Sequence, residues 1–270
     1  MLDLSKYRGI SQFGRAYQIM MENDTHASGS VDRVLAQGMI QLCPETVAYL
    51  YGGYTPVQVQ YEKGSRPELE RWAEEAVADC HSSEEQIEGI VRFTSDLGKK
   101  VVDEDLDAMR FGGIEEEIIR RGSDWCTDVA RVGCIMCQVV GLPARLVALF
   151  NTEQAYSGHV IIETYRGGIW AAVDPTTAVI YRHSGMKPAS TWELMQQPQL
   201  IEAHWKDDGS TPYTSVGQFR HAAISNYFVS DWRHYDYTVS PINDYKRPIL
   251  EMSMQGWPGG LRWLHGEDKA

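Results

Sequence analysis

Apolar residues recur at helical spacing along the middle of the chain. Over residues 67–80 they fall on one face, behind a proline in the first turn, and predict an amphipathic helix. A second stripe follows Ser83 and Gln86, which have the spacing of a capping box at a helix start. The acidic segment 103–120 predicts a helix, a loop and a short helix. A third stripe predicts a helix over about 125–140, which a glycine and a proline end.

Other segments have the pattern of strands. Residues 57–61 alternate with period two, as a half-buried strand does. Residues 144–150 and 159–165 are rich in apolar and β-branched side chains and predict two further strands. The turn 166–168 and the apolar segment 169–173 predict a hairpin that returns along the second of them. The predicted order is therefore helix, strand, strand, strand.

The C-terminal third is irregular and aromatic. A helix is predicted over about 190–204, and 13 aromatic residues fall in the 90 residues from Tyr181 onward. Because many large rings in an irregular segment must be buried against something, we expect this segment to wrap a core. The predicted organisation is an N-terminal segment with short strands packed on the core (1–62), a catalytic core (63–185) and a C-terminal extension (186–270).

Composition places the chain among globular proteins. Apolar residues make up 43% and charged residues 23% of its 270 residues, which argues against wholesale disorder. No apolar stretch approaches about 18 residues, so we expect no membrane-spanning helix. The first residues lack the apolar region of a signal peptide, and five cysteines is an odd number for a disulfide framework. We therefore expect reduced thiols and a cytoplasmic protein.

The net charge of −12 is concentrated in one segment. Between Glu62 and Glu117 there are 17 acidic and 7 basic residues, a net of −10. Such a surface repels phosphate backbones, so we expect no nucleic acid partner. The acidic residues are interpreted as the solvated face of amphipathic helices.

Three polar residues lie at the ends of the predicted elements. Cys126 falls in the first turn of a helix that Ser123 or Asp124 can cap, where backbone N–H groups favour a thiolate and can stabilise an oxyanion. His159 opens one strand of the hairpin and Asp174 ends the other. Because antiparallel neighbours lie about 5 Å apart, their side chains can touch. Packing the helix tip against that end completes a Cys-His-Asp triad.

Three motifs together resemble the transglutaminase-like superfamily over roughly residues 63–185. They are Arg121-Gly122-Ser123-Asp124-Trp125-Cys126-Thr127-Asp128-Val129-Ala130 with Gly141-Leu142-Pro143-Ala144-Arg145-Leu146-Val147, then His159 with Glu163, and Trp170-Ala171-Ala172-Val173-Asp174-Pro175-Thr176. The resemblance implies an α+β, papain-like core with a nucleophile helix packed on an antiparallel sheet. It also implies Cys126 as nucleophile, His159 as base, Asp174 as orienting acid, and no cofactor.

The remaining reactive residues favour structural roles. Cys134 and Cys137 form a lone C-x-x-C pair on a largely apolar helix, and the other histidines have no ligand spacing, so no metal site is expected. Within the motifs, Asp128 and Arg145 are interpreted as structural, with Asp128 or Glu163 as the partner of Arg145.

Substrate contacts are predicted from aromatic residues. Trp125 either lines the substrate groove or packs in the core. The C-terminal extension is predicted to form one wall of the groove, with Trp232, Tyr235 or Tyr237 closest to Cys126.

The leading hypothesis is a cysteine enzyme that acts on an amide through a thioester, with either water or an amine as the second substrate. The expected partner is a peptide, an amide or a small glycan-bearing substrate. Two alternatives remain at this point: a glycan-active amidase or lyase that uses the same cysteine and histidine, and a non-catalytic module that binds a peptide or partner.

Overall fold

The computed structural model describes residues 39–52, 57, 59, 61–100, 114–123, 125–150, 158–202 and 216–225. A six-stranded antiparallel sheet lies at the centre of this part of the chain. The order of strands across the sheet is β1-β6-β2-β3-β4-β5. In chain order the strands are β1 (Met39–Leu42), β2 (Ala144–Phe150), β3 (Gly158–Arg166), β4 (Ile169–Asp174), β5 (Val179–Ile180) and β6 (His221–Ser225).

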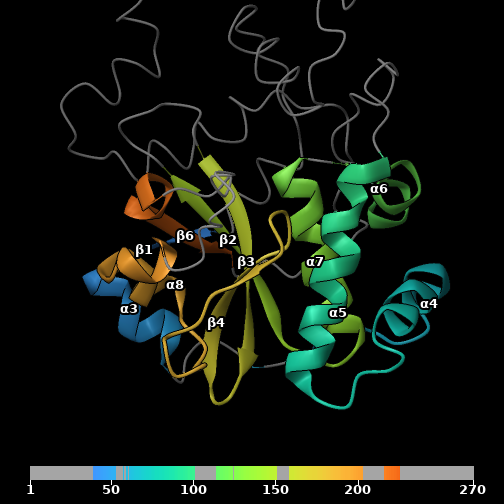
Figure 1. Cartoon of the computed structure of the whole chain (residues 1–270), viewed down its shortest axis with the longest axis horizontal. Coiled ribbons are helices and arrows are strands. Elements are labelled where there is room, and N and C mark those ends of the chain that lie inside the picture. The colour runs from blue at the N-terminus through green and yellow to red at the C-terminus, as the bar shows by residue number, and fades with distance from the viewer. Residues whose placement is uncertain are drawn as a thin grey trace, which may run out of the picture.

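Helices cover both faces of this sheet (Figure 1). One face carries α4 (Pro67–Ala76), α5 (Ser83–Ser95), the 3-10 helix η2 (Asp96–Lys100), α6 (Glu115–Arg121) and α7 (Cys126–Val139). The other face carries α3 (Pro44–Tyr51), α8 (Thr191–Gln196), α9 (Gln199–Glu202) and the 3-10 helix η4 (Val216–Arg220). Among the described residues, no helix has the length and apolar character that crossing a membrane requires.

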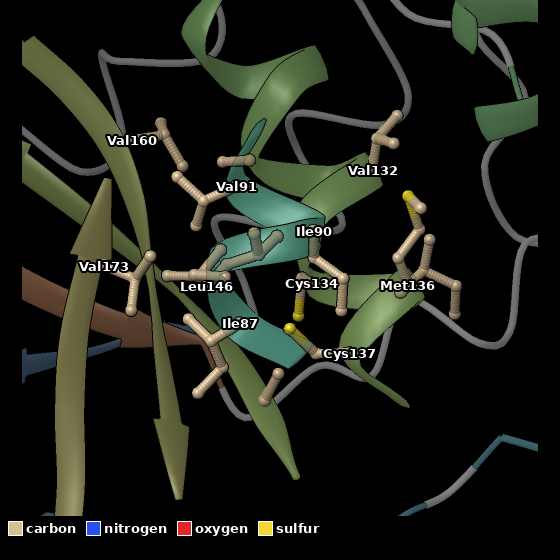
Figure 2. Close-up of a cluster of buried hydrophobic side chains, with 14 of the residues drawn as sticks. Ile87, Ile90, Val91, Val132, Cys134, Met136, Cys137, Leu146, Val160 and Val173 are labelled. Atoms are coloured by element: carbon tan, nitrogen blue, oxygen red, sulfur yellow. The ribbon is translucent and has the colours of Figure 1, made fainter. Parts of the chain in front are cut away.

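Strand β2 shows how the sheet separates two hydrophobic clusters. Leu146 and Ala148 face the cluster under α7, whereas Val147 and Leu149 face the cluster under α3 and α8. Successive side chains of a strand point to opposite faces, so a strand covered on both sides is apolar throughout. Figure 2 shows the first cluster, in which side chains of α5 and α7 meet those of β2, β3 and β4.

The helices predicted over 67–80 and 125–140 are confirmed as α4 and α7. The predicted capping box of Ser83 and Gln86 is wrong: the N-cap of α5 is Ser82, whose hydroxyl accepts from Glu85 N at 3.3 Å, while the Glu85 carboxylate accepts from His81 N at 2.6 Å. Of the predicted segment 103–120, the structure describes α6 and leaves residues 103–113 outside the described part.

The single helix predicted over 190–204 is wrong, since α8 and α9 are separate. Pro198 lies between them, and proline both lacks a backbone N–H and disfavours helical geometry at the residue before it. Gln197 accordingly has φ −132° and ψ 74°.

The hairpin between β3 and β4 is confirmed, with Gly167 and Gly168 at positive φ angles of 57° and 82°.

The strand predicted over 57–61 is wrong at its described positions. Val57, Val59 and Tyr61 belong to no strand, and Val57 and Val59 are exposed. Strand β6 was not predicted from the sequence, although it pairs with both β1 and β2. The sheet therefore combines strands from all three predicted segments.

A buried ion pair ties α3 and α8 to the sheet. Arg145 on β2 donates from Nε to Glu163 Oε2 at 2.8 Å, across the β2–β3 register, and Tyr51 donates to Glu163 Oε1 at 2.6 Å. The guanidinium lies 4.2 Å from the ring centroid of Trp170, and Thr191 N donates to Glu163 at 2.8 Å. Of the two predicted partners of Arg145, Glu163 is the correct one.

Replacement of Arg145 by methionine is expected to lower the free energy of unfolding by about 3–5 kcal/mol, because it leaves the Glu163 carboxylate buried without its cation. Chemical denaturation measures this loss. Adding Glu163→Gln removes the orphaned charge and should recover part of the stability. A loss below about 1 kcal/mol for Arg145→Met, as is common for an exposed ion pair, would contradict the assignment.

Candidate active site

Cys126 is the first residue of α7, where the sequence predicts a nucleophile. The helix begins with the bond from Val129 N to Trp125 O, at 3.0 Å. The N–H groups in the first turn of a helix point out of its end, where they can bind a developing negative charge. Cys126 is 4% exposed and belongs to the hydrophobic cluster under α7, so little of the residue meets solvent.

His159 and Asp174 meet at the end of the β3–β4 hairpin away from its turn. His159 Nε2 lies 2.9 Å from Asp174 Oδ2, and both side chains are fully buried. The other oxygen of Asp174 accepts from the backbone N–H groups of Thr176 and Thr177, at 3.0 and 3.3 Å. The turn that follows β4 therefore fixes the carboxylate, and the carboxylate fixes the imidazole ring.

Cys126 contacts the same ring. Burial by itself lowers the pKa of His159, but the charge and hydrogen bond of Asp174, together with a hydrogen bond and charge from Cys126, raise that pKa to about 10. With Nε2 bound to Asp174, Nδ1 is the ring nitrogen that can exchange a proton with Cys126. The structure thus brings all three residues of the predicted triad together, in the order Cys126, His159, Asp174.

The raised pKa of His159 predicts a pH-dependent stability. A histidine whose pKa rises on folding, here from 6.5 to about 10, stabilises the fold fully below the lower value and loses that contribution as pH rises through the upper one. We therefore expect the free energy of unfolding to fall between about pH 6.5 and 10. Denaturation of wild type and His159→Gln across this range tests it. Equal pH dependence in the two proteins would contradict a protonated His159.

Helix α7 packs closely against β3 and the turn that follows β4. A Cβ added to Gly133 would lie 3.0 Å from Pro175 Cγ and 3.7 Å from Ile162 Cδ1. Pro175 directly follows Asp174, so a glycine at 133 lets the helix that carries Cys126 pack tightly against the turn that carries Asp174. Neither the cysteine motif nor the histidine motif indicates this contact by itself.

The aromatic residues predicted to contact substrate are placed only in part. Trp125 precedes Cys126 and is 6% exposed, so most of its ring packs in the protein. Trp232, Tyr235 and Tyr237 lie outside the described residues.

The other cysteines differ from Cys126 in their surroundings. Burial raises the pKa of the Cys137 thiol to about 12 and raises that of Cys134 well above its ordinary value, and both side chains pack in the core (Figure 2). All five cysteines lie in the described residues, and none forms a disulfide. Within that part of the chain, no group of three or more potential ligands could hold a metal ion.

Comparison with known proteins supports the resemblance seen in the sequence. Residues 70–175 match the model of the Transglutaminase-like superfamily, and this range includes all three residues of the predicted triad. No curated protein sequence matches the chain.

One solved structure is similar in part. It is the crystal structure of a "putative cysteine protease" from Cytophaga hutchinsonii, with 18% sequence identity and a TM-score of 0.32. The match covers 52% of this chain and 44% of that one, so this chain spans less than half the length of the protein that it matches.

Proposed function

Because residues 70–175 match the model of the Transglutaminase-like superfamily, we propose that this protein is a cysteine enzyme that cleaves or exchanges an amide bond through a thioester on Cys126. The observation that carries the proposal is the position of His159, which contacts Cys126 on one side and Asp174 on the other. A nucleophile, a base and a group that orients the base are what covalent amide chemistry requires.

The first half of the reaction forms the thioester. With a pKa near 10, His159 is protonated at neutral pH, and a cation beside Cys126 favours the thiolate. The thiolate attacks the amide carbonyl, and N–H groups in the first turn of α7 stabilise the oxyanion. When the C–N bond breaks, His159 gives its proton to the leaving amine, and an acyl group remains on the Cys126 sulfur.

The second half releases the acyl group. Neutral His159 takes a proton from water or from an incoming amine, which attacks the thioester carbonyl. Collapse of the second tetrahedral intermediate expels the thiolate and restores the first state, with His159 protonated. Water gives hydrolysis, and an amine gives acyl transfer. Asp174 holds the ring in one orientation throughout and stabilises its protonated form.

The proposed substrate is a peptide or another small amide that presents a carbonyl to the tip of α7. We place the enzyme in a reducing compartment such as the cytoplasm, because its nucleophile must remain a thiol and none of its five cysteines, all of them described, is in a disulfide.

An activated ester tests the chemistry without knowledge of the natural substrate. Wild-type protein is treated with p-nitrophenyl acetate, and the release of p-nitrophenolate is followed together with the mass of each cysteine peptide. We expect a burst of product and one acetyl group on Cys126. The partly exposed Cys43 and Cys80 serve as internal controls for unassisted thiol reactivity.

A second step separates hydrolysis from acyl transfer. Acetylated enzyme is transferred to buffer with or without a dansylated primary amine, and acetylated amine is measured beside free acetate. Acetylation that favours Cys43 or Cys80 over Cys126, or that persists unchanged in His159→Gln, would overturn the proposal.

A further inference from the structure

The N-cap residue of α7 cannot cap the helix with its side chain. Trp125 occupies this position, and its indole N–H is a donor only. Helix starts are usually held by a side-chain oxygen that accepts from the N–H groups of the first turn. The sequence suggests Ser123 or Asp124 for that role. The structure places Ser123 differently, because its hydroxyl accepts from Trp125 N at 3.1 Å, one residue before the helix.

Ser123 is in turn oriented by Asp128. The Ser123 hydroxyl donates its hydrogen to Asp128 Oδ2 at 3.1 Å. A hydroxyl has a single hydrogen, so once Asp128 accepts it a lone pair of Ser123 is left for the N–H of Trp125. Ser123 is 0% exposed and Asp128 1% exposed, so water does not compete for these bonds.

Asp128 is held by a buried network of charges. Arg121 Nη2 lies 2.8 Å from Asp128 Oδ2, and Arg131 Nη1 lies 4.0 Å from Asp128 Oδ1. The network continues from Arg131 to Glu115 and from there to Arg66, which also pairs with Glu116. Three arginines face three carboxylates and link the start of α4, helix α6 and helix α7.

The effect of these contacts is to fix one peptide unit. Trp125 is held at its N–H by Ser123 and at its carbonyl by Val129 N. The Trp125 carbonyl and the Cys126 N–H belong to the same peptide unit, so these contacts also orient the N–H of the nucleophile. Pre-oriented donors of this kind account for much of the rate of acyl transfer.

We propose that Ser123 and Asp128 are positioning residues, which orient the Trp125–Cys126 peptide so that the Cys126 N–H faces the oxyanion. This inference rests on the proposed function. It assigns a task to Asp128, which the sequence indicates only as a structural member of the cysteine motif.

Two reagents separate this role from a general one in folding or thiol reactivity. Acetylation by p-nitrophenyl acetate passes through an oxyanion. Alkylation by iodoacetamide displaces iodide at a CH₂ carbon and forms no oxyanion. A defect in orientation of the peptide therefore slows acetylation of Cys126 much more than alkylation of the same sulfur.

The test compares Ser123→Ala with wild type, reading both reactions on Cys126 by mass spectrometry. We expect acetylation to slow by about 10- to 100-fold, while alkylation stays close to the wild-type rate. The matched control is Ser190→Ala, which removes another helix-start hydroxyl, accepting from Glu193 N at 3.2 Å, on the opposite face of the sheet. That variant should leave both rates unchanged.

A second variant, Asp128→Asn, tests the inference independently. Asp128→Asn retains an oxygen that accepts from Ser123, so acetylation should slow less than in Ser123→Ala. The double variant should be no slower than Ser123→Ala alone, because both changes act through one hydroxyl. Unchanged acetylation in folded Ser123→Ala would overturn the inference, as would an equal loss of both reactions. Wild-type protein that gains no acetyl group on Cys126 would instead overturn the proposed function, and this inference with it.

Discussion

Cys126→Ser is expected to abolish acetylation from p-nitrophenyl acetate at residue 126 and to lower amide turnover by about 10⁴-fold or more. A serine hydroxyl at this site is a far weaker nucleophile than a thiolate beside a protonated imidazole. The measurement is the burst of p-nitrophenolate together with the mass of the peptide that contains residue 126.

The stability of the same variant needs its own control. A residue at a helix tip is expected from sequence to bury little, but Cys126 is 4% exposed and packs in the main cluster. Serine preserves its shape better than alanine does, and folding can be followed by circular dichroism. Cys80→Ser removes a partly exposed thiol and should leave the burst intact. A full burst from folded Cys126→Ser would rule out covalent catalysis at this residue.

Asp174→Asn is expected to lower kcat by up to about 10⁴-fold while the protein still folds. The asparagine oxygen can still accept from Thr176 N and Thr177 N, so the turn after β4 is retained. Its amide nitrogen would then face His159 Nε2 and force the proton of a neutral ring onto Nδ1, toward Cys126. A ring in that tautomer cannot take a proton from the nucleophile or from an incoming amine.

Two measurements distinguish this cause from a loss of structure. The pH dependence of acetylation should move to lower pH, because removal of the Asp174 charge removes the main influence that raises the pKa of His159. Thermal denaturation should show a folded protein with a cooperative transition. An acetylation rate and pH profile equal to those of wild type would contradict the role assigned to Asp174.

The sequence predicted the helix and strands around the site because their patterns are local. Helical spacing located α7, and a pair of glycines located the hairpin that aligns His159 with Asp174. Helical spacing and turn glycines can be recognised without knowing which distant segments pack against them. The family resemblance added the roles of the three residues, which spacing alone could not assign.

The features that the sequence did not reveal depend on contacts between distant segments. Strand β6 has only five residues, two of them alanines with low strand propensity, and its pairing with β1 and β2 is not encoded locally. The choice of Glu163 over Asp128 as partner of Arg145 follows from the β2–β3 register. The contact between Gly133 and Pro175 joins a helix and a turn that are 42 residues apart, and only the packed structure displays it.

The place of β6 in the sheet has a consequence for biosynthesis. Strand β2, next to the strand that carries His159, gains its second neighbour only when residues 221–225 arrive, and β1 pairs with β6 as well. Until that point a ribosome-bound chain would present β2 as an uncovered edge, which invites pairing with other chains. Contacts of such long sequence separation also slow folding. We therefore expect the chain to acquire its fold late in translation and fragments that end before β6 to aggregate rather than to work as smaller enzymes.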